Sequence, residues 1–119
     1  MKRILVVEDN KANMYLIRFI LSKAGYEVLE AWSGEEGVER AIQEKPDLVI
    51  MDIQLPGIDG LEATRRIRKS KIDGKIPIVA LTSYAMVGDR EKALAAGCTG
   101  YIEKPINPET FMAEIEKFL

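Results

Sequence analysis

The alternation of short apolar runs with longer segments of helical period constrains the fold of this chain more than any other feature. Most of the runs are apolar without alternation, which is typical of strands buried on both faces of a parallel sheet. The runs are residues 4–7, a weaker one at 27–31, residues 48–51, residues 76–81 across Pro77, and residues 101–102. They predict five short strands.

The segments between the runs have recognisable helix ends. Residues 11–24 are followed by Gly25, a common residue just past a helix. Ser33 stands three residues before Glu36, the spacing of a capping box for a helix that reaches residue 44. Asp59 is a candidate N-cap for the helix that follows.

Two further helices complete the pattern. We expect one over residues 85–96, ending before Gly97 and containing Gly88, which costs about 1 kcal/mol relative to alanine and makes the helix less rigid. Asn107 and Pro108 predict an N-cap and first turn for the last helix. The order βαβαβαβαβα predicts an α/β fold with a parallel sheet covered by helices on both faces. It occupies the chain as one domain, residues 1–119.

Composition excludes several classes of function. The chain has no histidine and a single cysteine, Cys98, so a histidine base, a disulfide and a multi-thiolate metal site are all excluded. The net charge of −2 and the short apolar runs favour a soluble cytoplasmic protein that binds neither nucleic acid nor membrane. The cationic residues Arg65, Arg66, Arg68, Lys69 and Lys71 are interpreted as a solvated helix face rather than a nucleic-acid patch.

Polar side chains follow four of the five runs. Glu8 and Asp9 follow the first, Asp52 the third, Thr82 and Ser83 the fourth, and Lys104 the fifth. In an open parallel sheet, a ligand site lies at the carboxyl ends of the strands, so we expect these side chains to converge. Each alone fits a turn or a cap, and we infer a site from the set.

Three converging carboxylates repel one another, by about 4 kcal/mol per pair at ~4 Å and an effective dielectric of ~20. An all-oxygen site of this kind suits Mg²⁺. With Lys104 and Thr82 beside the metal, the residues predict a phosphoryl site in which Asp52 is the nucleophile.

The chain resembles the receiver domain of two-component response regulators over its whole length. The matching pieces are residues 5–10, 47–60, 79–83, 96–98 and 101–105, and the set is specific in its order and spacing. Within that family it looks most like stand-alone regulators of the DivK kind or receivers of hybrid kinases.

The resemblance implies a flavodoxin-like (βα)5 fold with strand order 2-1-3-4-5. It implies that Asp52 accepts a phosphoryl group from a phosphohistidine on a histidine kinase or phosphotransfer protein. It further implies that Mg²⁺ is bound by Asp9, Asp52 and the Gln54 carbonyl, with Glu8 acting through water. Lys104 and Thr82 would hold the phosphoryl oxygens.

The resemblance also assigns roles in switching. Tyr101 would turn inward with Thr82, and the Lys104–Pro105 bond would be cis. Gln54 and Tyr84 stand at positions that tune the lifetime of the phosphoryl group. Ser83 departs from the usual alanine, and Glu8 from the commoner aspartate.

We therefore predict a signalling switch that is not a turnover enzyme and whose output is a changed protein contact on the fourth helix, fifth strand and fifth helix. The downstream protein target is not identified by the sequence. Two alternatives were weighed. One is a receiver-like scaffold that is never phosphorylated. The other is a phosphatase of the haloacid dehalogenase type, which wants an aspartate where this chain has Gln54.

Overall fold

The computed structural model describes residues 2–70, 76–83 and 88–119 and contains five strands alternating with five helices. The strands are β1 (Arg3–Val7), β2 (Glu27–Ala31), β3 (Leu48–Asp52), β4 (Ile78–Thr82) and β5 (Gly100–Glu103). The helices are α1 (Lys11–Lys23), α2 (Gly34–Glu44), α3 (Gly60–Lys69), α4 (Asp89–Ala96) and α5 (Phe111–Glu116). The predicted element order is confirmed.

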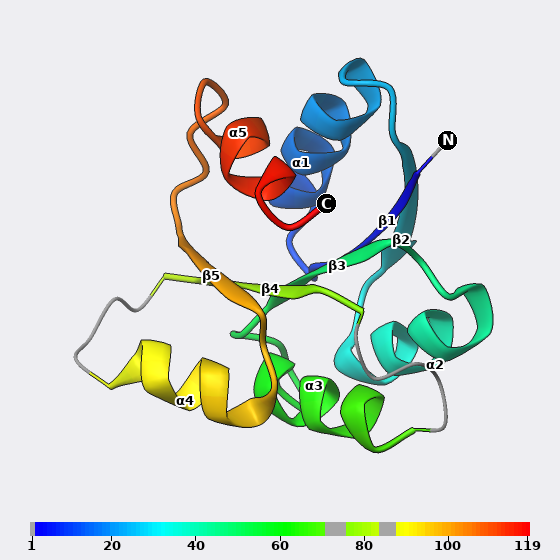
Figure 1. The fold of residues 1–119 in the computed structure, drawn as a ribbon, viewed down its shortest axis with the longest axis vertical. Coiled ribbons are helices and arrows are strands. Elements are labelled where there is room, and N and C mark those ends of the chain that lie inside the picture. The colour runs from blue at the N-terminus through cyan, green and yellow to red at the C-terminus, as the bar shows by residue number, and fades with distance from the viewer. Residues whose placement is uncertain (1, 71–75, 84–87) are drawn as a thin grey trace.

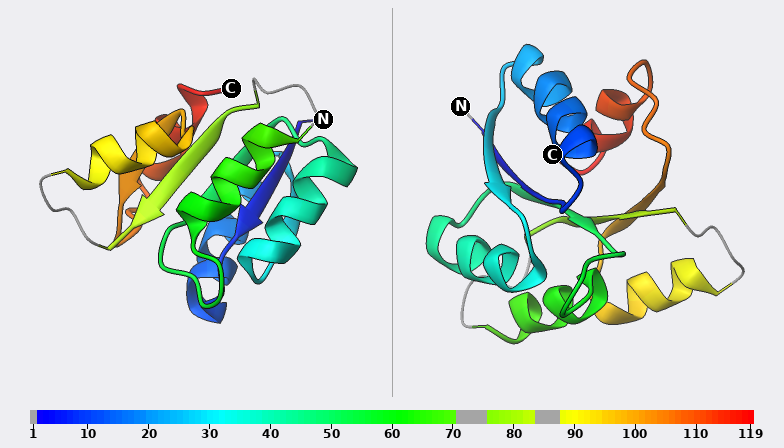
Figure 2. Two further views of the ribbon diagram at one scale, coloured as in Figure 1. Left: turned by 90° about the horizontal axis from the view of Figure 1, so that it is seen from below. Right: turned by 180° about the vertical axis from the view of Figure 1, so that it is seen from behind.

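The strands form one parallel sheet in the order β2-β1-β3-β4-β5, which confirms the flavodoxin-like topology. Helices α1 and α5 cover one face, and α2, α3 and α4 cover the other (Figures 1 and 2). Successive side chains of a strand point to opposite faces. Ile4 and Val6 accordingly pack in the α1/α5 core, whereas Leu5 and Val7 pack in the opposite core. The side chains on both faces of the central strands are therefore buried.

Side-chain caps define the starts of the first three helices. Asn10 and Asp59 each accept a hydrogen bond at 2.9 Å from a backbone N–H in the first turn of α1 and α3. Ser33 Oγ accepts from Glu36 N at 3.1 Å, as the capping-box spacing predicts. The Glu36 carboxylate accepts from Trp32 N at 2.7 Å, so it reaches back past Ser33 itself.

Two helix predictions are wrong in detail. Gly88 does not lie inside α4, because it precedes the first residue of that helix with a φ of 97°, a conformation outside the helical region that glycine adopts readily. The regular part of α5 begins at Phe111, later than the Asn107–Pro108 signal predicts. Asn107 accepts from Glu109 N through its side chain and from Phe111 N through its carbonyl, both at 2.9 Å, which closes a separate turn before the helix.

The interpretation of the basic residues of α3 as a solvated face is wrong for Arg68. Its Nε donates to the Gly97 carbonyl at 2.9 Å, and another guanidinium nitrogen lies 3.3 Å from Thr99 Oγ1. Arg68 thus ties α3 to the end of α4 and the start of β5. Across the described ranges, no helix has both the length and the apolar character needed to cross a membrane.

Candidate phosphoryl and metal site

The predicted polar residues meet at one edge of the sheet because the strands end in register. Val7 pairs with Met51, Asp52 with Leu81, and Thr82 with Glu103. Glu8 and Asp9 directly follow β1, and Lys104 directly follows β5. The carboxyl ends of four neighbouring strands therefore deliver their side chains to a common place.

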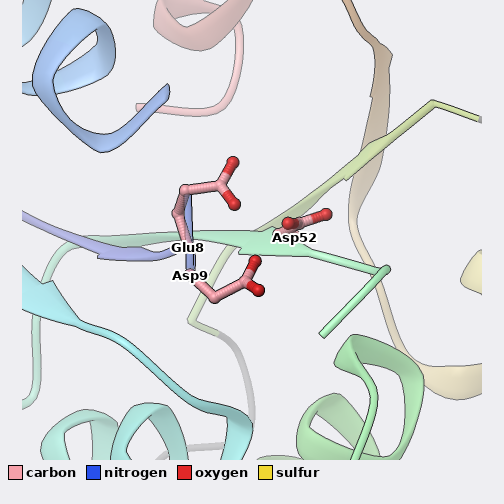
Figure 3. A group of neighbouring side chains, drawn as sticks. All are labelled: Glu8, Asp9 and Asp52. Carbon is pink, nitrogen blue, oxygen red and sulfur yellow. The ribbon is translucent and has the colours of Figure 1, made fainter. Parts of the chain in front are cut away.

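Three carboxylates converge at this edge. Oxygen atoms of Glu8, Asp9 and Asp52 all lie within 4.8 Å of one another. Figure 3 shows their carboxylates directed toward a common space beside the end of β3. Glu8 and Asp52 are buried, with 0% and 1% of their surfaces exposed, whereas Asp9 is exposed. The cluster thus has two carboxylates inside the protein and one at its mouth.

Lys104 is the cation of the cluster. Its Nζ lies 3.1 Å from Glu8 Oε1 and 3.1 Å from Asp52 Oδ2, and its side chain is only 13% exposed. The position of Lys104 is set by the sheet, because its backbone N–H donates to the Thr82 carbonyl at 2.8 Å. The Lys104–Pro105 peptide bond that follows is cis.

Burial and charge shift the pKa values of this group. Burial raises the pKa of Glu8, and the neighbouring Asp52 raises it further, against a smaller lowering by Lys104. Burial by itself lowers the pKa of Lys104, but Asp52 and Glu8 outweigh it and raise that pKa above its usual value. The lysine therefore stays charged, and its charge does not balance the carboxylates around it.

The residues present fit a hard divalent cation. When all three carboxylates are ionised, Lys104 leaves the cluster with a formal charge of two minus. Glu8 Oε1 is buried and lies 3.1 Å from Lys104 Nζ. The donors are all oxygen, which matches Mg²⁺. The cluster thus offers the charge and the ligand type for this metal.

The neutral side of the site is formed by Thr82, Gln54 and Tyr101. Thr82 is buried at the end of β4, with 3% of its surface exposed. Gln54 Nε2 donates to Thr82 Oγ1 at 2.8 Å, and Ser83 N donates to Gln54 Oε1 at 3.0 Å. Tyr101 is half-buried on β5; burial raises its pKa, as do nearby acidic residues, while a hydrogen bond with Thr82 lowers it.

The structure differs from the sequence expectations at two site positions and leaves a third untested. Asp52 and Thr82 are the last residues of β3 and β4 and are buried, although the apolar pattern places them past the strands. The reason is backbone pairing, which continues one residue further: Ile53 N donates to the Leu81 carbonyl at 2.9 Å. Tyr84 lies outside the described residues.

One contact was not anticipated. The family resemblance predicts that Gln54 offers its backbone carbonyl to the metal and affects the lifetime of the phosphoryl group. Its side-chain bridge to Thr82 and Ser83 joins residues 28 or more positions apart, and no local pattern indicates such a bond. The only available signal was a polar residue of sufficient reach two positions after Asp52.

Comparison with known proteins gives a consistent result. The sequence model of the response regulator receiver domain matches residues 4–116. The polar-differentiation response regulator DivK of Brucella ovis is 41% identical over 118 residues, which are 99% of this chain and 96% of that protein. DivK of Brucella anthropi is 40% identical over the same shares of the two chains.

Solved structures are similar over the whole fold. The chemotaxis protein CheY4 of Vibrio cholerae superposes with a TM-score of 0.94 at 30% identity, over 100% of this chain and 99% of that one. The receiver domain of a sensor histidine kinase from Pseudomonas aeruginosa gives a TM-score of 0.90 at 37% identity, over 98% and 96% of the two chains. That structure has a magnesium ion coordinated in its active site cleft.

Proposed function

Because this chain belongs to the response regulator receiver domain family, we propose that it is a phosphorylation-driven switch in a two-component phosphorelay, with residues 1–119 as one receiver domain. Asp52 accepts a phosphoryl group from a phosphohistidine on a sensor kinase or phosphotransfer protein. A single observation carries the proposal: Asp52 shares a cluster within 4.8 Å with Glu8 and Asp9, and Lys104 contacts it at 3.1 Å. The protein supports its own phosphoryl transfer and is not a turnover enzyme.

The transfer is a displacement at phosphorus. A carboxylate oxygen of Asp52 forms a P–O bond as the P–N bond of the donor phosphohistidine breaks, and the imidazole leaves with the bonding electron pair and takes up a proton. These 119 residues include no histidine, so the donor phosphohistidine lies outside them. Lys104 and the Thr82 hydroxyl bind the phosphoryl oxygens and spread the charge of the transferring group.

Mg²⁺ would be held by Asp9, Asp52 and the Gln54 carbonyl, with Glu8 acting through water. When bound, the metal supplies positive charge that lets the Asp52 carboxylate and a phosphoryl group approach each other. The role of Glu8 follows from its burial beside Lys104, which holds the lysine where it also contacts Asp52.

The output is a changed protein contact on the surface formed by α4, β5 and α5. Tyr101 connects this surface to the site, since its hydroxyl bonds to Thr82 and its ring also borders a surface groove of about 450 Å³. The groove is lined by Arg90, Tyr101, Ile102, Glu103, Glu114, Lys117 and Phe118. When Thr82 binds a phosphoryl group, Tyr101 moves with it and reshapes this groove for the downstream protein.

The proposal is tested with Asp52→Asn. We expect acetyl phosphate with Mg²⁺ to add one phosphoryl group to the wild type and none to the variant, because an amide lacks the nucleophilic carboxylate. Intact-mass spectrometry measures the addition, and the same reaction in EDTA tests the need for the metal. Asp47→Asn is the matched control, since Asp47 directly precedes the other end of the same strand. Modification of Asp52→Asn, or no modification of the wild type, would contradict the proposal.

A further inference from the structure

The side chain of Gln54 spans the site from the segment after β3 to the end of β4. Its Nε2 donates to Thr82 Oγ1 at 2.8 Å, and its Oε1 accepts from Ser83 N at 3.0 Å. We call this pair of hydrogen bonds the Gln54 clamp. The backbone N–H of Ser83 can only donate, so it must face the amide oxygen, and the amide nitrogen then faces Thr82. The direction of both bonds is therefore fixed.

The directions of these two hydrogen bonds limit where the Thr82 hydroxyl can place its single proton. A hydroxyl has one O–H donor and two acceptor lone pairs. Because Gln54 donates to Thr82, the threonine must accept on that side, and its proton is directed elsewhere. Tyr101 also forms a hydrogen bond with Thr82. The proton of Thr82 therefore serves a partner other than Gln54.

A phosphoryl group on Asp52 competes for the same proton. Phosphoryl oxygens only accept, so Thr82 binds them by turning its O–H toward Asp52, while the hydrogen bond from Gln54 Nε2 at 2.8 Å holds its oxygen in the present position. The clamp therefore stabilises the arrangement that must be abandoned when Asp52 is modified.

The clamp is anchored on the residue that starts the change. The backbone N–H of Gln54 donates to Asp52 Oδ1 at 3.1 Å, so Gln54 contacts both the phosphoacceptor and the threonine. Gln54, Thr82 and Tyr101 also border a cavity of about 180 Å³, and Ser83 is exposed. At ~30 Å³ for each water, this space admits water that can solvate the groups once the clamp opens.

We propose that the Gln54 side chain is a positioning residue that holds Thr82 and Ser83 in the resting arrangement and sets how readily the site switches. The inference rests on the proposed function, because it assigns Thr82 to the phosphoryl oxygens. It concerns the amide of Gln54, whereas the metal would use the backbone carbonyl of the same residue.

The test is Gln54→Met, which keeps the length of the side chain and removes both hydrogen bonds. Beryllofluoride with Mg²⁺ is the probe, and its affinity is measured by titration. Each net hydrogen bond changes an equilibrium by roughly two- to tenfold. We expect the variant to bind the probe more tightly by roughly that factor. Unchanged or weaker binding overturns the proposal, and weaker binding assigns the amide to the phosphorylated arrangement instead.

Two measurements separate the clamp from a general effect on structure. Gln43→Met removes a glutamine amide from the exposed face of α2, and we expect wild-type affinity. In a Thr82→Val background, Gln54→Met should change the affinity less than it does in the wild type, because one partner of the clamp is gone. Equal effects in both backgrounds would show that Gln54 does not act through Thr82.

Amide hydrogen exchange at Ser83 reads the clamp directly. We expect the exchange to be slow in the resting wild type and faster in Gln54→Met. Saturating beryllofluoride with Mg²⁺ should also accelerate it in the wild type. Equal exchange in the resting wild type and variant overturns the clamp, whatever the titration shows. A wild type that binds no beryllofluoride contradicts the proposed function, while the resting-state exchange still tests the clamp.

Discussion

The site has an acidic half, Glu8, Asp9, Asp52 and Lys104, and a hydroxyl half, Gln54, Thr82, Ser83 and Tyr101. The carboxylates of the acidic half lie at the ends of the central strands β1 and β3, and two of the three are buried, whereas Lys104 follows the edge strand β5. The hydroxyl half includes the exposed Ser83 and the half-buried Tyr101, and it borders a cavity of about 180 Å³. The charged side chains therefore lie mostly at buried strand ends, whereas the neutral side chains lie beside a cavity that leaves them room to move.

This difference suits a switch. Metal and phosphoryl binding need charges held at fixed positions, because rearranging these groups on binding would reduce the binding free energy. The response needs groups with two arrangements that differ by only a few kcal/mol, and single hydrogen bonds are of that size. Asp52 and Gln54 link the halves, because the backbone N–H of Gln54 bonds to the Asp52 carboxylate.

The largest expected effect compares two glycines. A Cβ at Gly60 would overlap the backbone carbonyl of Asp52, whereas a Cβ at Gly88, which precedes α4, meets no atom of the described residues within 4 Å. We expect Gly60→Ala to lower the free energy of unfolding by about 3 kcal/mol, because the backbone at Asp52 must shift to make room for the Cβ. Gly88→Ala should lower it by only about 1 kcal/mol, the strain of a φ of 97°.

Urea denaturation measures both variants, and Mg²⁺ affinity sharpens the contrast. Gly60→Ala should weaken Mg²⁺ binding because it displaces Asp52, whereas Gly88→Ala should bind Mg²⁺ as the wild type does. Equal losses of stability and equal affinities would mean that the acidic half is no more confined than the start of α4.

A smaller effect is expected from Lys104→Met. Without metal, the change leaves two buried carboxylates facing each other, and we expect the free energy of unfolding to fall by about 2 kcal/mol. This loss is smaller than that for a fully buried ion pair, because the Lys104 side chain is 13% exposed. Mg²⁺ should restore most of this loss, since the cation takes over the charge of the lysine. Phosphorylation-induced change should be weakened, because Lys104 no longer binds the phosphoryl oxygens.

The measurement is urea denaturation in EDTA and in saturating Mg²⁺. Lys69→Met, at an exposed position near the end of α3, is the control and should show no metal-dependent loss. A deficit of Lys104→Met that is the same in both conditions would contradict the assignment of Lys104 to the charge balance of the site.

The smallest effect concerns the hydroxyl half at high pH. Burial raises the pKa of Tyr101, so the phenol stays protonated in the folded protein at pH values where the unfolded chain, with a tyrosine pKa of about 10, has begun to ionise. The stability that Tyr101 contributes is therefore complete below about pH 10 and falls as the pH rises through the folded pKa. Tyr101→Phe should make this decline less steep.

Thermal unfolding between about pH 9 and pH 11 measures the slope. Tyr15→Phe, which removes a hydroxyl from a 72% exposed ring on α1, is the matched control. A slope unchanged by Tyr101→Phe would show that the phenol titrates alike in the folded and unfolded chains.

The sequence by itself determined the order of the elements, the parallel sheet and the residues that meet at its edge. These follow from local patterns: unbroken apolar runs specify strands buried on both faces, caps and glycines mark helix ends, and strand ends in an open sheet face one side. Glu8, Asp52 and Thr82 could be identified because each directly follows such a run, and Lys104 because it lies two residues past one.

Only the tertiary structure decided how these residues interact. Backbone pairing of Asp52 with Leu81 and of Thr82 with Glu103 carried these two residues into the buried part of the sheet, beyond the last apolar residue of each run. The ion pairs of Lys104 and the Gln54 clamp join residues distant in the chain, so their partners depend on how separate strand ends are brought together. Local sequence specifies which chemical groups are available at the edge, whereas packing specifies which group receives each charge and each proton.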